Sequence, residues 1–114
     1  MIIKPVKFID GLTTATNGNS HALNVPSGKM TVEVSFTEGT ATTCNALTID
    51  IEGSLTGTSW FALASHTLTS GERTSKAAMF HVVDKPVLYI RGNITTLTKT
   101  GVNNVTVSSW LVAK

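Results

Sequence analysis

The chain has 114 residues, which is the size of a single domain and long enough to build a core without disulfides or metal ions. Charged residues make up only 14% of it, and the net charge of +2 comes from scattered lysines and arginines, which argues against nucleic-acid binding. The single cysteine excludes an intrachain disulfide, and because we find neither a signal peptide nor a membrane span, we expect synthesis in the cytoplasm and no membrane contact.

The first predicted strand covers residues 2–9, and its position in a sheet is constrained by Pro5. Proline cannot donate a hydrogen bond to a strand ladder, so we expect residues 1–9 to form an edge strand or an extended arm. Such an arm is a candidate contact with a partner protein, through Ile2, Ile3, Lys4, Pro5 and Val6.

Residues 13–20 are rich in Thr, Asn and Gly and predict a loop, followed by a short strand over residues 21–25 and a turn at 26–28. The next strand, residues 29–36, has the clearest alternation of the chain. Side chains of a strand alternate between its two faces. The buried face of this strand therefore consists of Met30, Val32, Val34 and Phe36.

Residues 47–63, with the sequence LTIDIEGSLTGTSWFAL, predict a β-hairpin. Leu47, Ile49 and Ile51 share one face of its first strand, and small polar residues around Gly57 form the turn. The second arm runs over residues 60–68.

Trp60 and Phe61 are adjacent on this second arm and must point to opposite faces. If Phe61 faces the core, Trp60 faces outward and is a candidate anchor for a partner protein or a sugar ring. The alternative is that both faces are covered. The same two alternatives, outward-facing or covered, apply to Trp110, which is adjacent to Leu111.

Residues 69–76 form the most polar segment, in which we favour a loop over one helical turn. Strands are predicted over residues 77–83, 87–95 and 105–112, and Gly92 marks a bulge or a close backbone approach. Seven or eight short strands joined by short turns predict one all-β domain over residues 1–114. We expect an antiparallel β-sandwich, with a jelly roll among the candidate topologies.

Catalytic and metal-binding patterns are weak in this sequence. His21, His66 and His81 fit no zinc or metalloprotease spacing, and no nucleotide-binding loop occurs. Asp50 and Glu52 lie two residues apart on one strand face, at a spacing near that of a glycosidase pair. We favour a solvated acidic face, extended by Glu33 on a neighbouring strand, and expect neither an enzyme nor a cofactor or metal ion.

Three runs carry a family resemblance: IEGSLTGTSWFALASHTLT, AAMFHVVDKPVLYIRGNITTL and the final VTVSSWLVAK. Together they resemble the head decoration, or capsid cement, proteins of tailed bacteriophages. The sharpest element is the turn from Glu52 to Leu55 with Gly57 and Trp60, a pattern that carbohydrate-binding modules also contain. Thr56 stands where such modules often carry Asp, so a role for that carboxylate cannot be transferred.

The resemblance implies a protein on the capsid exterior of the virion that clamps neighbouring major capsid protein subunits, acting in many copies or as a homo-oligomer. No catalytic residue, nucleic acid or membrane takes part in this role. Two alternatives stay open: a sugar-binding or host-adhesion module of a phage tail, and a structural component of the tail or connector.

Overall fold

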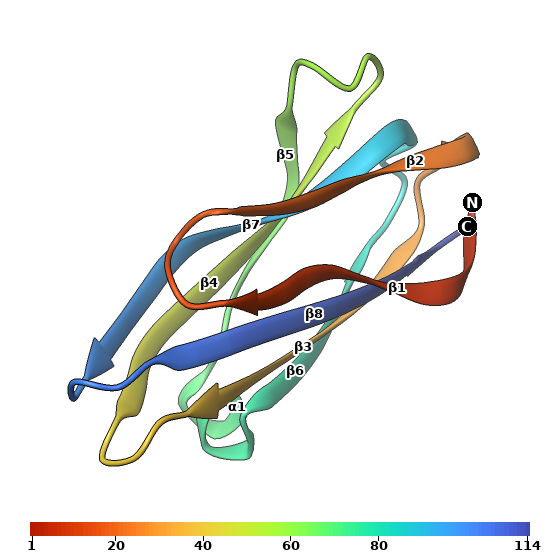
Figure 1. Cartoon of the computed structure of the whole chain (residues 1–114). Helices are drawn as coiled ribbons and strands as arrows, with labels where there is room; N and C mark the ends of the chain where they lie inside the picture. Colours follow the sequence, from red (N-terminus) through yellow and green to blue (C-terminus); the bar gives the residue numbers. More distant parts are fainter.

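The computed structural model describes the whole chain, residues 1–114, as two four-stranded antiparallel sheets packed face to face (Figure 1). Sheet A contains, in spatial order, β1 (Ile2–Leu12), β8 (Val105–Ala113), β3 (Met30–Glu38) and β6 (Ala77–Val82). Sheet B contains β2 (Asn17–Ser27), β7 (Val87–Thr100), β4 (Thr43–Ser54) and β5 (Phe61–Thr67). The predicted all-β antiparallel sandwich is confirmed.

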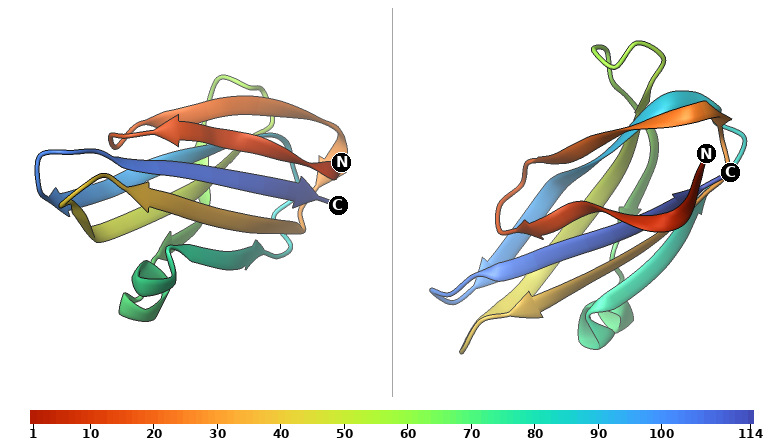
Figure 2. Two further views of the ribbon diagram at one scale, coloured as in Figure 1. Left: turned by 60° about the horizontal axis from the view of Figure 1, so that its bottom comes forward. Right: turned by 45° about the vertical axis from the view of Figure 1, so that its right-hand side comes forward.

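The strand pairing is nested. β1 pairs with β8, β2 with β7, β3 with β6 and β4 with β5, as if one long hairpin had been folded over itself. Two further pairings, β3 with β8 and β4 with β7, complete the two sheets, whose layers can be followed in Figure 2. This arrangement of eight strands in two sheets is the jelly roll.

The core lies between the two sheets and is built from the alternating residues of β3 and β4. Leu47, Ile49 and Ile51 on β4 are fully buried, as their spacing predicts. On β3 the predicted inner face is also confirmed, since the buried residues are Met30, Val32, Val34 and Phe36.

β1 forms one edge of sheet A and is interrupted by bulges. Ile2 pairs with Ala113 and Val6 with Leu111, so three residues of β1 lie opposite Val112 alone. Pro5 is one of these three, where its missing N–H costs no ladder hydrogen bond. A second shift, between Lys7 and Ile9, inserts Phe8 as an extra residue, which lets Phe8 and Ile9 both enter the core.

Gly92 lies where β1 packs across the core onto β7. A Cβ atom at this position would lie 2.6 Å from Phe8 Cε2 and 2.8 Å from Ile9 Cδ1. The pairing of β7 with β4 is regular at Gly92, but the pairing of β7 with β2 shifts opposite it, between Asn17 and Ser20. Both predicted explanations, a bulge and a close approach, therefore meet at this position.

The loop predicted over residues 13–20 is wrong in its second half, because β2 begins at Asn17. Asn17 pairs with Asn93 and Ser20 with Arg91, which places β2 at the edge of sheet B. An edge strand is held by backbone pairing on one side and leaves its polar side chains in solvent. The apolar periodicity on which the prediction depended is therefore absent.

The loop preferred for residues 69–76 is also wrong: Ser70–Ser75 form a helix, α1. Thr69 is its N-cap, and its hydroxyl accepts a hydrogen bond from the Glu72 backbone N–H at 3.2 Å. Glu72 Oε1 in return accepts one from the Thr69 N–H at 2.9 Å. This reciprocal capping box is encoded in the Thr-Ser-Gly-Glu run and stabilises a helix that composition alone disfavours.

Glu72 makes the stability of this helix depend on pH. The hydrogen bond from the Thr69 N–H, and in addition the side chain of His66 at 3.0 Å, hold the pKa of Glu72 below its ordinary value. The resulting stabilisation is fully present above about pH 4.3 and is lost as the pH falls through the lower pKa of the folded state.

We therefore expect Glu72→Gln to lower the free energy of unfolding by about 0.5 kcal/mol at pH 7 and by less near pH 3. Urea denaturation of both proteins at the two pH values measures this difference. Glu33→Gln is the control, because Glu33 is exposed and forms no ion pair. A gap between Glu72→Gln and the unaltered protein that was as large at pH 3 as at pH 7 would contradict the assignment.

Candidate functional site

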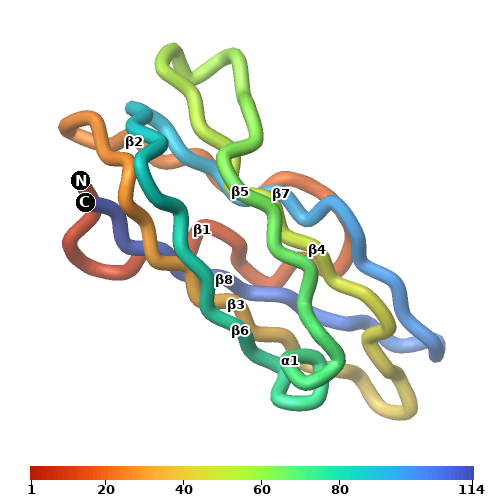
Figure 3. The backbone as a smooth tube through the Cα atoms, turned by 180° about the vertical axis from the view of Figure 1, so that it is seen from behind, coloured from red at the N-terminus to blue at the C-terminus, as the bar shows by residue number.

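Exposed apolar side chains gather at one end of the sandwich. This end, here called the apolar end, carries residues 1 and 114 and the β2–β3, β4–β5 and β6–β7 connections (Figures 1 and 3). Six of the eight large exposed hydrophobic residues lie there: Met1, Ile3, Val25, Leu55, Phe61 and Val83. Exposed apolar side chains that gather at one end of a folded domain make that end a candidate interaction surface.

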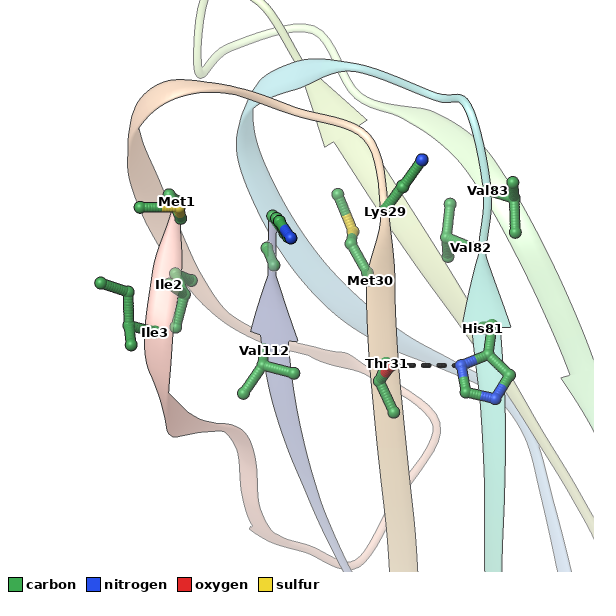
Figure 4. A pocket seen from close by; sticks show the side chains of 12 residues that line it. Met1, Ile2, Ile3, Lys29, Met30, Thr31, His81, Val82, Val83 and Val112 are labelled. Carbon is green, nitrogen blue, oxygen red and sulfur yellow. Dashed lines mark hydrogen bonds between the residues drawn. The ribbon is translucent and has the colours of Figure 1, made fainter.

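The hollow of largest volume at the apolar end is a groove of about 510 Å³, here called the terminal groove, across the strand ends of sheet A. Its strands come together through one register row, in which Ile2 pairs with Ala113, Ala113 with Met30, and Met30 with Val82. Figure 4 shows the apolar side chains around it, with Ile3 on β1 and Val83 after β6 at opposite sides. Eight of its twelve lining residues are hydrophobic.

The polar residues of the terminal groove are Lys29, Thr31, His81 and Lys114. Thr31 and His81 are register partners on β3 and β6, and Thr31 Oγ1 lies 3.1 Å from His81 Nδ1 in a hydrogen bond (Figure 4). Lys29 and Lys114 are held side by side by reciprocal backbone hydrogen bonds of 3.2 and 2.8 Å. No acidic residue lines the groove.

A shallower hollow of about 160 Å³ lies beside the groove on the outer face of sheet A. It is lined by Pro5, Met79 and Trp110, among others. Trp110 is half-buried, and Lys7 Nζ lies 5.3 Å from its ring centroid in a cation–π arrangement.

The structure thus brings together six of the seven predicted contact residues. Ile2 and Ile3 line the terminal groove, Pro5 and Trp110 line the adjoining hollow, and Lys4 and Val6 lie on the same strand. Val83, His81 and Lys29 carry no local signal for this site, because only the non-local pairing of β3 with β6 and β8 brings them to β1.

Trp60 lies elsewhere, beside sheet B, and is half-buried. Its ring stacks on the guanidinium of Arg91, whose Cζ is 4.5 Å from the ring centroid. Phe61 is the exposed aromatic residue of the pair, at 69%. The pair matches neither predicted alternative in full, since Phe61 is exposed and Arg91 covers the ring of Trp60.

The solvated acidic face predicted around Asp50 and Glu52 is not observed. Glu52 is 15% exposed in its side chain, and its Oε1 lies 2.6 Å from Arg91 Nε in an ion pair. Asp50 is half-buried, with its Oδ1 atom enclosed and without a hydrogen-bond partner. Glu33 is on β3 in the other sheet, so it does not extend this face.

The remaining reactive side chains occupy separate environments. His66 pairs with Glu72 and stacks on Phe80 with ring centroids 4.8 Å apart, while burial raises the pKa of the Cys44 thiol. No three or more His, Cys, Asp or Glu side chains are grouped as metal ligands. The structure contains no helix with the length and apolar character needed to cross a membrane.

No protein-family model and no curated protein matches the chain. Among solved structures, that of the SPBc2 prophage-derived protein YomS has a similar fold, with a TM-score of 0.64 and 13% sequence identity. The similarity covers 97% of this chain and 92% of that chain, so it extends over the whole sandwich.

Proposed function

We propose that this chain is a non-enzymatic structural protein of a phage virion that decorates the capsid exterior and stabilises it by clamping neighbouring major capsid protein subunits. The observation that carries the proposal is the apolar end, with six of the eight large exposed hydrophobic residues on one end of a jelly roll. The similar fold of a prophage-derived protein supports a phage origin. The proposed role needs no cofactor, nucleic acid or membrane.

The apolar end is suited to adhesion because its side chains project from rigid parts of the backbone. Ile3 and Trp110 project from strands of sheet A, and Val83 from a short connection, so little conformational entropy is lost on binding. Burying one large apolar side chain contributes roughly 1.5–3 kcal/mol. Many copies on one capsid add avidity to a modest single contact.

Ile3→Asp tests the proposal at a residue that is 78% exposed and outside the core. We expect the variant to fold normally and to bind purified capsids that lack the protein about 10- to 100-fold more weakly, measured by co-sedimentation. A point substitution is preferred to deleting residues 1–7, because these residues form half of β1 and Ile2 packs on the core.

Val102→Asp is the matched control, since Val102 is 94% exposed in the β7–β8 connection at the opposite end of the sandwich. It should bind capsids as the unaltered protein does. Equal capsid binding by Ile3→Asp would remove the apolar end as the capsid contact.

An observation on the β4–β5 hairpin supports the alternative function, a sugar-binding or host-adhesion module of a phage tail. Leu55 and Phe61 are both more than 60% exposed there, around a hollow of about 420 Å³. Electron microscopy of virions with the protein labelled separates head, connector and tail locations. A label on the tail, together with glycan binding that Phe61→Ala removes, would replace the capsid role by host adhesion.

A further inference from the structure

We propose that the terminal groove binds an extended apolar segment of the partner protein that carries an acidic side chain. This inference rests on the proposed function and specifies the chemistry that the partner must present. Three features of the groove support it: its charge, its dimensions and its polar floor.

The groove is lined by two lysines that have no ion-pair partner and by no acidic residue. Lys29 and Lys114 line it and take part in none of the four ion pairs of the structure. Lys85, also unpaired, lies close by because its backbone N–H bonds to Gly28 O. Of the acidic residues, Asp84 lies in the β6–β7 connection and Glu33 lines the adjoining hollow, but neither lines the groove itself. A carboxylate on the occupant would therefore meet unpaired cations.

The dimensions of the groove fit an extended chain. The groove crosses four strands, so its length is about three strand spacings, roughly 14 Å, which about four residues of extended chain cover.

The polar floor favours a peptide over a lipid chain. Thr31 occupies Nδ1 of His81, which leaves the other ring nitrogen of this exposed histidine free in a groove with apolar sides. A peptide backbone offers hydrogen-bonding groups along its whole length, whereas an acyl chain offers none beyond its headgroup. Val112 and Val83 supply the apolar contacts on either side of this floor.

The test uses three fluorescein-labelled peptides of eight residues, with alternating valine and serine and with glutamate, glutamine or lysine near the centre. We expect the protein to bind the glutamate peptide about fivefold more tightly than the lysine peptide at low salt, measured by fluorescence anisotropy. The double variant Lys29→Glu, Lys114→Glu should reverse this preference. Lys99→Glu is the control, because Lys99 lies at the opposite end and bonds to Asn103 O.

Equal affinity for the three peptides, or an unchanged preference in the double variant, would overturn the inference. So would binding of dodecanoate or of vesicles with anionic lipid that depends on Lys29 and Lys114 while no peptide binds. Failure of this inference can be distinguished from failure of the capsid proposal. Normal capsid binding by the double variant overturns this inference alone, whereas the expected peptide preference without any capsid binding supports it and overturns the capsid role.

Discussion

Phe8→Ala is expected to lower the free energy of unfolding by about 3–5 kcal/mol. Phe8 is fully buried at the bulge of β1, and its ring reaches across the core to Gly92 on β7. Truncation leaves a cavity between the two sheets, at a point where a glycine offers no side chain to fill it. Because domains of this size are stable by only about 5–15 kcal/mol, a large share of the stability is lost.

Urea denaturation monitored by tryptophan fluorescence measures the effect of Phe8→Ala. Phe61→Ala removes the same atoms from a residue that is 69% exposed, and we expect it to change the free energy of unfolding by less than about 0.5 kcal/mol. Similar losses in the two variants would mean that Phe8 does not hold the sheets together as described.

Gly92→Ala is expected to lower the free energy of unfolding by about 1–3 kcal/mol, for the opposite reason. The added methyl group would lie 2.6 Å from Phe8 Cε2 and 2.8 Å from Ile9 Cδ1, so one side chain or the spacing of the sheets must shift. The double variant Gly92→Ala, Phe8→Leu should lose less free energy of unfolding than the sum of the two single variants, since the smaller side chain at position 8 makes room for the added methyl group.

Gly71→Ala is the control for this substitution. Gly71 lies in α1, and the nearest atom to an added Cβ, Thr69 Oγ1, is 3.9 Å away. Alanine there should leave stability unchanged or raise it by up to about 1 kcal/mol. If Gly92→Ala were equally harmless, β1 and β7 would be less closely packed than the structure requires.

The sequence predicted the elements whose signal is local. Met30 to Phe36 and Leu47 to Ile51 alternate cleanly because one face of each strand is buried, and both inner faces are as predicted. The polar strand β2 was only half predicted and the helix α1 was not, although Thr69 and Glu72 spell a capping box. Short polar elements are stabilised by backbone pairing and caps, which hydrophobic periodicity does not report.

The candidate site was predictable only in part because it depends on pairing between distant strands. Pro5 correctly indicated an edge strand, and Trp110 lies on the strand that pairs with it. Lys29 and His81 join them only through the nested pairing of the jelly roll. The ring of Trp60 is covered by Arg91 of β7, a contact between residues far apart in the sequence that the alternation of β5 does not report.

The edge formed by β1 is built for side-chain contacts and not for strand addition. Its bulges interrupt the register, Pro5 lacks an N–H, and Lys4 and Lys7 are exposed. These are devices by which natural sheets prevent edge-to-edge aggregation. The edge therefore exposes Ile3 without offering a continuous β-edge to another sheet.

The two chain ends lie together at the apolar end, next to the terminal groove (Figure 1). An affinity tag or fluorescent protein fused to residue 1 or residue 114 would lie over the terminal groove. It would compete with the partner segment that we propose to bind there. Insertion beside Val102, in an exposed connection at the far end, keeps a reporter clear of the docking surface. A label inserted in this loop therefore reports the location of the protein and leaves the terminal groove uncovered.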